Sequence, residues 1–215
     1  MIPSTIVLRP LLLLDLAMKA VLVSLLALAV LWPQLPQLEG DGYAAWRALI
    51  YPISLVVVPL GWAVFGRPRA EPFPYGVDLL VPLPLVIDVA APRLYHTVDW
   101  WDKFMHGVSW SVLGSVSVLV LSWFRPSRAL AGGLALGIAL LTALLWELWE
   151  YLVWVRPSPE LLETEYSDTV GDLGCDLAAS ALAVTLTLLV IMRRDHGAST
   201  GLGNGRPMRS ELTGS

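Results

Sequence analysis

The stretch LAGGLALGIALLTALLWELWEYLVW, residues 130–154, contains no charged side chain before Glu147. As a helix rising 1.5 Å per residue, it is long enough to cross a hydrocarbon layer of about 30 Å. Comparable apolar stretches lie at residues 11–32, 43–65, 104–124 and 170–192. Residues 130–154 therefore predict a transmembrane helix, and the repetition predicts a polytopic helical membrane protein.

The composition supports a membrane location. Hydrophobic residues make up 56% of the 215-residue chain and charged residues 15%, a balance that leaves too little polar surface to cover a water-soluble domain. The lipid bilayer is therefore the expected partner. The net charge is −4 and the basic residues are scattered, which excludes a nucleic-acid-binding surface. The single cysteine, Cys175, cannot form an internal disulfide.

A sixth apolar segment, residues 77–94, is interrupted by prolines at positions 82, 84 and 92 and carries Asp88 in its second half. Proline breaks the hydrogen-bond ladder of a helix. We therefore expect this third span to be kinked, and a complete crossing and a partly re-entrant segment both stay open.

The charges outside the spans predict orientation. Arginines follow alternate spans, at Arg67 and Arg69, Arg125 and Arg128, and Arg193 and Arg194, whereas the intervening loops are mainly acidic. Cytoplasmic loops carry the basic excess. We expect an all-α transmembrane bundle of about six spans, with both ends in the cytoplasm. Residues 1–195 form one domain, and the Gly- and Ser-rich residues 196–215 are expected to be a disordered cytoplasmic tail.

The first span also admits a cleaved signal peptide, because Lys19 precedes the apolar run 20–32, which contains an Ala-Leu-Ala sequence. Retention is favoured, since the apolar stretch begins near Leu11 and Arg9 already supplies a cytoplasmic anchor. Within a retained helix, Asp15 and Lys19 lie four residues apart and are expected to pair.

Small residues at four-residue spacing predict close helix approach in the last three spans. They are Gly107, Ser111 and Ser115, then Gly133 and Gly137, then Gly174 and Ala178. We expect these spans to form one tight sub-bundle.

Ionisable residues gather at the outward ends of the same three spans, each set on one helical face. The sets are Asp102 with His106, Glu147 with Glu150, and Asp168 with Asp172 and Asp176. A lipid-facing carboxylate is costly, by about 2.5–3.5 kcal/mol on insertion scales. The sets should therefore face one another or a watery cleft, and their repulsion requires a cation, protons or both.

Three interpretations follow. All seven residues are candidate ligands of a divalent metal ion. The same acids could instead form a proton or solute path, or serve as protonated hydrogen-bond glue between helices. His106 is the strongest single candidate, expected to be oriented by Asp102 while its other nitrogen meets a ligand, and Asp168 could act only as an N-cap. Asp88 is a further possible member, Cys175 is expected to be a packed thiol, and the ten tryptophans are expected to form mostly an interfacial belt.

Three motifs around these residues, WDKFMHG at 101–107, LWELWEY at 145–151 and DTVGDL at 168–173, resemble blocks of YjdF-like bacterial inner-membrane proteins. The blocks are Asp-Lys-x-x-His, Glu-x-x-Glu and Asp-Thr-x-x-Asp. VanZ-like proteins share a looser version, from which Gly107 and the acidic Asp176 depart. The resemblance covers about residues 77–185 and implies a multi-pass protein of the bacterial cytoplasmic (inner) membrane, with no settled biochemical activity.

Two functions from different classes stay open. The first is a metal-dependent membrane enzyme acting on a lipid or envelope precursor, with Glu147 or His106 moving a proton. The second is a non-enzymatic protein, either a small cation or proton carrier or an envelope-stress accessory protein, in which the acids are a path or interhelical glue.

Overall fold

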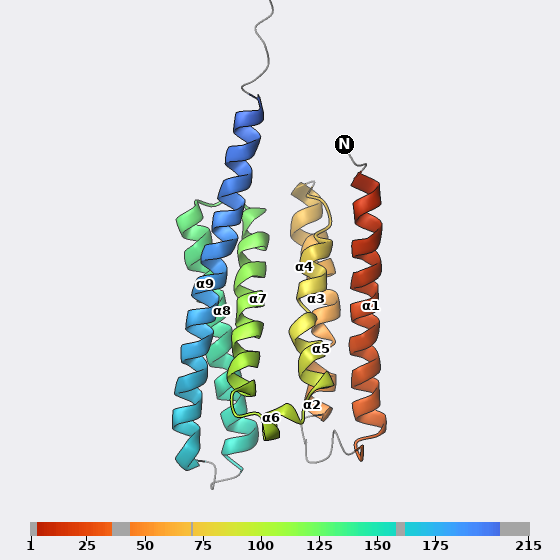
Figure 1. Cartoon of the computed structure of the whole chain (residues 1–215), viewed down its shortest axis with the longest axis vertical. Helices are drawn as coiled ribbons and strands as arrows, with labels where there is room; N and C mark the ends of the chain where they lie inside the picture. Colours follow the sequence, from red (N-terminus) through yellow and green to blue (C-terminus); the bar gives the residue numbers. More distant parts are fainter. Residues whose placement is uncertain (1–3, 36–43, 70, 158–161, 203–215) are drawn as a thin grey trace, which may run out of the picture.

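The computed structural model describes residues 4–35, 44–69, 71–157 and 162–202. These residues form helices that run side by side as one bundle (Figure 1), and no strand occurs among them. Five segments are long and apolar enough to cross a membrane: Pro10–Leu31, Trp46–Arg69, Trp101–Ser122, Arg128–Val153 and Glu165–Arg193. The predicted all-α polytopic bundle is confirmed.

The first predicted span is a single helix, α1, which covers Ser4–Leu31. The second predicted span consists of α2 (Ala44–Ile50), α3 (Ile53–Gly61), the π-helical turn η1 (Trp62–Gly66) and the 3-10 turn η2 (Arg67–Arg69). The helix is interrupted between α2 and α3, next to Pro52, because proline has no N–H to continue the hydrogen-bond ladder.

The third predicted span is divided as its prolines required. Helix α4 (Tyr75–Leu80) and helix α5 (Leu83–Ala90) are separated at Val81 and Pro82. Both pack on α1 and follow the direction of the bundle (Figure 1). The segment is shorter than the five spans above, so its complete crossing stays a prediction. The short helix α6 (Leu94–Thr97) then lies across one end of the bundle (Figure 1).

The last three spans are α7 (Trp101–Ser122), α8 (Arg128–Glu150) and α9 (Leu162–Leu202). Ser127 caps α8 by accepting a hydrogen bond from the Leu130 N–H, and a π-helical turn, η3 (Tyr151–Val155), extends α8. Helix α9 starts earlier than predicted and continues beyond residue 195, where we expected the tail to begin. Residues 203–215 of that tail lie outside the described residues.

Helices α7, α8 and α9 pack mainly on one another, as predicted. Against α9, Ser111 of α7 donates to the Ala179 carbonyl at 3.4 Å, and Thr187 donates to Ser115 at 3.1 Å. The two helices also lie close together at Gly114, where an added Cβ would lie 3.2 Å from Val184 Cγ2 and 3.4 Å from the Ser180 carbonyl oxygen.

The small residues that were predicted to pack between helices on α8 and α9 lie on the exposed sides of these helices. Gly133, Gly137 and Gly174 would meet nothing within 4 Å through a Cβ, and all three are exposed. On α8 the buried small residues are instead Ala131, Ala135, Ala139 and Ala143. On α9 the buried stripe is Asp172, Asp176, Ser180 and Val184. The polar residues of α9 therefore decide which face turns inward.

The N-terminal half contains a buried ion-pair cluster. Lys19 lies 3.2 Å from Asp15, which confirms the predicted pair, and 2.6 Å from Asp78 of α4. Asp15 and Asp78 are almost fully buried, and one oxygen of each has no hydrogen-bond partner. This cluster ties α1 to α4.

Candidate functional site

The acidic sets on α7, α8 and α9 meet at the end of the bundle where α6 lies (Figure 1). That is the end at which α7 and α9 begin and α8 finishes. Residues one turn apart on each helix share a face, so acids from each of the three helices point toward the other two. Three chain segments that are distant in sequence thus build one cluster.

His106 is the centre of this cluster and is only 5% exposed. Its Nδ1 lies 3.1 and 3.2 Å from the two carboxylate oxygens of Asp176, which is fully buried. The imidazole also stacks on Trp110, with 5.3 Å between ring centroids and 8° between planes. Trp110 is itself fixed, because its indole N–H donates to the Ala139 carbonyl at 2.9 Å. The imidazole therefore has one orientation, with Nδ1 occupied and Nε2 left for another group.

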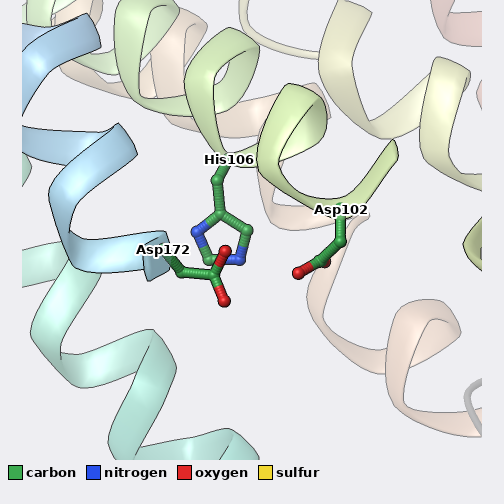
Figure 2. A group of neighbouring side chains, drawn as sticks. All are labelled: Asp102, His106 and Asp172. Atoms are coloured by element: carbon green, nitrogen blue, oxygen red, sulfur yellow. The ribbon is translucent and has the colours of Figure 1, made fainter. Parts of the chain in front are cut away.

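The expectation that Asp102 orients His106 is wrong, because Asp176 from α9 occupies Nδ1. Asp102 belongs instead to a group with His106 and Asp172, in which one potential ligand atom of each residue lies within 4.8 Å of the others. Figure 2 shows the carboxylates of Asp102 and Asp172 turned toward the imidazole ring. An imidazole nitrogen with two carboxylate oxygens is a donor set suited to a divalent transition ion.

A second group shares the same imidazole. His106, Glu147 and Glu150 also place one potential ligand atom each within 4.8 Å of one another. Glu147 is buried, and its Oε1 lies 3.9 Å from His106 Nδ1 without a hydrogen-bond partner. Because the two groups share His106, they form one cluster of five candidate metal ligands. The five are Asp102, His106, Glu147, Glu150 and Asp172.

Asp168 and Asp176, the other predicted ligands, lie outside both groups. Asp168 is exposed and accepts a hydrogen bond from Lys103. Asp176 contacts Nδ1 of His106 and so orients the ring. Each has a role in the cluster that does not require contact with an ion.

Lys103 is the nearest compensating charge. Its ammonium bonds to Asp168, lies 3.1 Å from Asp172 and lies 3.7 Å from Asp102. The Asp172 oxygen in this contact still lacks a hydrogen bond of good geometry, so the contact is electrostatic only. Six carboxylates thus face one lysine and one histidine. The excess negative charge, together with the unbonded oxygens of Glu147 and Asp172, fits a cation or added protons.

Asp88 does not join this cluster but forms a separate one with α2. Arg47 donates to its two oxygens at 2.7 and 3.1 Å, Tyr51 donates at 2.6 Å and Tyr95 donates at 2.8 Å. Burial and the adjacent Asp88 carboxylate raise the pKa of the Tyr95 phenol, which keeps it protonated as a donor. The Asp88 carboxylate is therefore fully paired.

Arg47, Tyr51 and Tyr95 were not among the polar residues predicted from the sequence to form a site. A signal was present, since Arg47 and Tyr51 lie four residues apart inside an apolar span, and a buried arginine demands an acid. Which acid could not be read from spacing, because the partner lies in another span.

A comparison with family models adds one finding. Residues 18–194 match the family described as "Predicted membrane protein (DUF2238)". No curated protein and no solved structure matches the chain. The match agrees with the resemblance to YjdF-like proteins, and no similarity to VanZ-like proteins is shown.

Proposed function

Because this chain belongs to the DUF2238 family of predicted membrane proteins, we propose a function for a site inside the bilayer. The α7–α9 cluster binds one divalent metal ion, of the zinc, manganese or iron class, and serves a reaction on a lipid or cell-envelope precursor. With the predicted orientation, the site lies near the outer face of the bacterial inner membrane.

One observation supports this proposal above the others: the arrangement around His106. Asp176 occupies Nδ1 of His106. One ring nitrogen of His106 and one carboxylate oxygen each of Asp102 and Asp172 lie within 4.8 Å of one another. Metal-binding histidines typically have such a carboxylate on the second ring nitrogen, which fixes the tautomer and the ring orientation. Three protein ligands with the remaining positions open are typical of catalytic rather than structural metal sites.

The neighbouring groups supply what a hydrolytic or transfer reaction needs. A bound ion would polarise a phosphoryl or ester oxygen as a Lewis acid. Glu147, whose buried Oε1 has no hydrogen bond, is placed to accept a proton from water or a substrate hydroxyl. Lys103 compensates the charge at the mouth of the site, and its bond to exposed Asp168 can persist when Asp102 and Asp172 bind an ion.

A second candidate, a cation or proton carrier, is favoured by the Asp15–Lys19–Asp78 cluster. Two buried carboxylates there share one lysine, and each retains an oxygen without a partner. Ionisable groups inside a membrane commonly mark ion or proton paths. A carrier would use this cluster and the α7–α9 cluster as successive sites.

Elemental analysis tests the metal site. Purified full-length protein is incubated with zinc or manganese, desalted and assayed beside the His106→Ala and Asp172→Asn variants. Glu163→Gln, an exposed acid of the first turn of α9, is the matched control. We expect about one equivalent in wild type and control and a loss in both site variants.

A wild-type protein that retains no ion, or variants that retain as much as the wild type, would contradict the proposal. Wild-type protein without bound metal that conducts cations or protons in proteoliposomes would instead support the carrier.

A further inference from the structure

A cavity of about 270 Å³ lies between the two halves of the bundle. Residues of α2, α5, α7 and α8 line it, and both His106 and Asp88 contribute to its wall. This volume is just below the roughly 300–1,000 Å³ typical of small-molecule sites. The cavity therefore suits a compact ligand or the head of a larger one.

Four tryptophans line this cavity, and each contacts the next in a row that runs from α7 through α8 to α2. Ring centroids are 6.5 Å apart for Trp110 and Trp146, 5.1 Å for Trp146 and Trp149, and 5.9 Å for Trp149 and Trp46. Trp46 is one of the ten tryptophans that were expected to form mostly an interfacial belt, and it also forms part of this wall. The result is a continuous aromatic surface, and the face of an indole ring attracts cations more strongly than other aromatic rings do.

The acidic residues that line the cavity also favour a positively charged ligand. Asp102 and Glu150 contribute carboxylates, and within the described part of the chain Glu150 has no hydrogen bond or ion pair. Arg47 also lines the cavity, but its charge is compensated by two bonds to Asp88. His106 lines the cavity too, but its ring is paired with Asp176, and Asp102 lies 3.7 Å from Lys103. Glu150 is therefore the lining acid that has no basic partner among the described residues.

We propose that this cavity binds an organic ammonium group, held against the four tryptophans and paired with Glu150. An anion would meet the carboxylates at short range, and an uncharged apolar ligand would cover the half-buried Glu150 carboxylate without giving it a partner. A quaternary or primary ammonium satisfies both the rings and the acid. The inference goes beyond the proposed function, because it requires no metal ion.

Choline and its uncharged isostere 3,3-dimethylbutan-1-ol test the charge directly. Each is titrated into the purified full chain in maltoside micelles with EDTA present, and binding is followed by tryptophan fluorescence. We expect a saturable change with choline and at least tenfold weaker binding of the isostere. Because EDTA removes divalent ions, this result is independent of whether the metal proposal holds.

Variants locate the site. Trp146→Leu and Glu150→Gln should each weaken choline binding about tenfold, and Trp146→Phe should retain part of the affinity. Trp100→Leu is the control, since Trp100 is 62% exposed and lies outside the cavity. Circular dichroism confirms that each variant folds, and the wild-type comparison of choline with its isostere stands without them.

The ammonium group could be free or carried by a lipid. Dihexanoyl-phosphatidylcholine binding more tightly than choline would assign the cavity to a lipid headgroup, and weaker binding would assign it to a free amine. Equal binding of choline and its isostere, preference for sn-glycerol 3-phosphate, or no saturable choline signal would each overturn the inference.

Discussion

At the scale of single residues, the contact between Asp176 and His106 matters most. Spacing along α7 made Asp102 the expected partner of His106, yet the carboxylate that reaches Nδ1 comes from α9. Sequence shows which residues share a helical face but not which facing residue reaches which atom. The membership of the cluster was therefore predictable, and the division of roles within it was not.

The role of Asp176 can be tested with Asp176→Asn, which keeps the shape of the side chain but removes its charge. A metal-orienting carboxylate of this kind typically contributes a factor of about 10–100 in affinity. We expect that loss in a competition titration of zinc against a chelator. Asp99→Asn, in the exposed turn before α7, should bind as the wild type does. Unchanged affinity in Asp176→Asn would remove Asp176 from the site.

Lys19 offers a second test at this scale. Lys19→Met leaves Asp15 and Asp78 buried without their cation, which should destabilise the fold by about 3 kcal/mol. Lys19→Arg keeps the charge and should lose much less. Reversible unfolding in mixed micelles, followed by circular dichroism, measures the difference. Equal stability of the two variants would show that the cluster contributes little to folding.

At the scale of helices, hydropathy predicted the spans well, because crossing the bilayer sets a minimum apolar length. The expected interruption of the third span lies at Pro82, between α4 and α5. The small-residue faces of α8 and α9 were misjudged, since glycine spacing alone does not say which side of a helix faces its neighbours. Burial of Asp172 and Asp176 outweighs the contact that Gly174 would have made.

Gly114 and Gly133 form a matched pair for testing this packing. Leucine at position 114 would press on Val184 and the Ser180 backbone, whereas position 133 faces open space. We expect Gly114→Leu to destabilise the protein by about 1–3 kcal/mol. Gly133→Leu should be neutral or stabilising, because glycine is a poor helix former. The same unfolding measurement applies, and equal effects would contradict the α7–α9 contact.

At the scale of the whole molecule, the membrane topology determines on which side of the membrane the α7–α9 cluster lies. Arginine-bearing loops were predicted on one side and the acidic ends of α7–α9 on the other. In the structure the connections from η2 to α4 and from α7 to α8 lie at the same end of the bundle, opposite α6 (Figure 1). The cavity between the halves was not predictable, since it depends on pairing across spans such as that of Arg47 with Asp88.

Single cysteines in a Cys175→Ser background test the six-span topology. A membrane-impermeant maleimide applied to spheroplasts should label Asp99→Cys. Glu71→Cys and Ser127→Cys should be labelled only after permeabilisation, because in the predicted six-span topology the α4–α5 segment and α7 each cross the membrane. Labelling of Glu71→Cys and Asp99→Cys from the same side would mean that α4–α5 re-enters.

The central claim is that His106 and carboxylates from separate helices coordinate one ion. X-ray absorption spectroscopy of zinc-loaded protein observes that coordination directly. We predict a shell of nitrogen and oxygen donors at about 2.0–2.2 Å, with imidazole scattering that disappears in His106→Ala. A sulfur distance near 2.3 Å, which would implicate Cys175, or a shell unchanged in His106→Ala, would contradict the account.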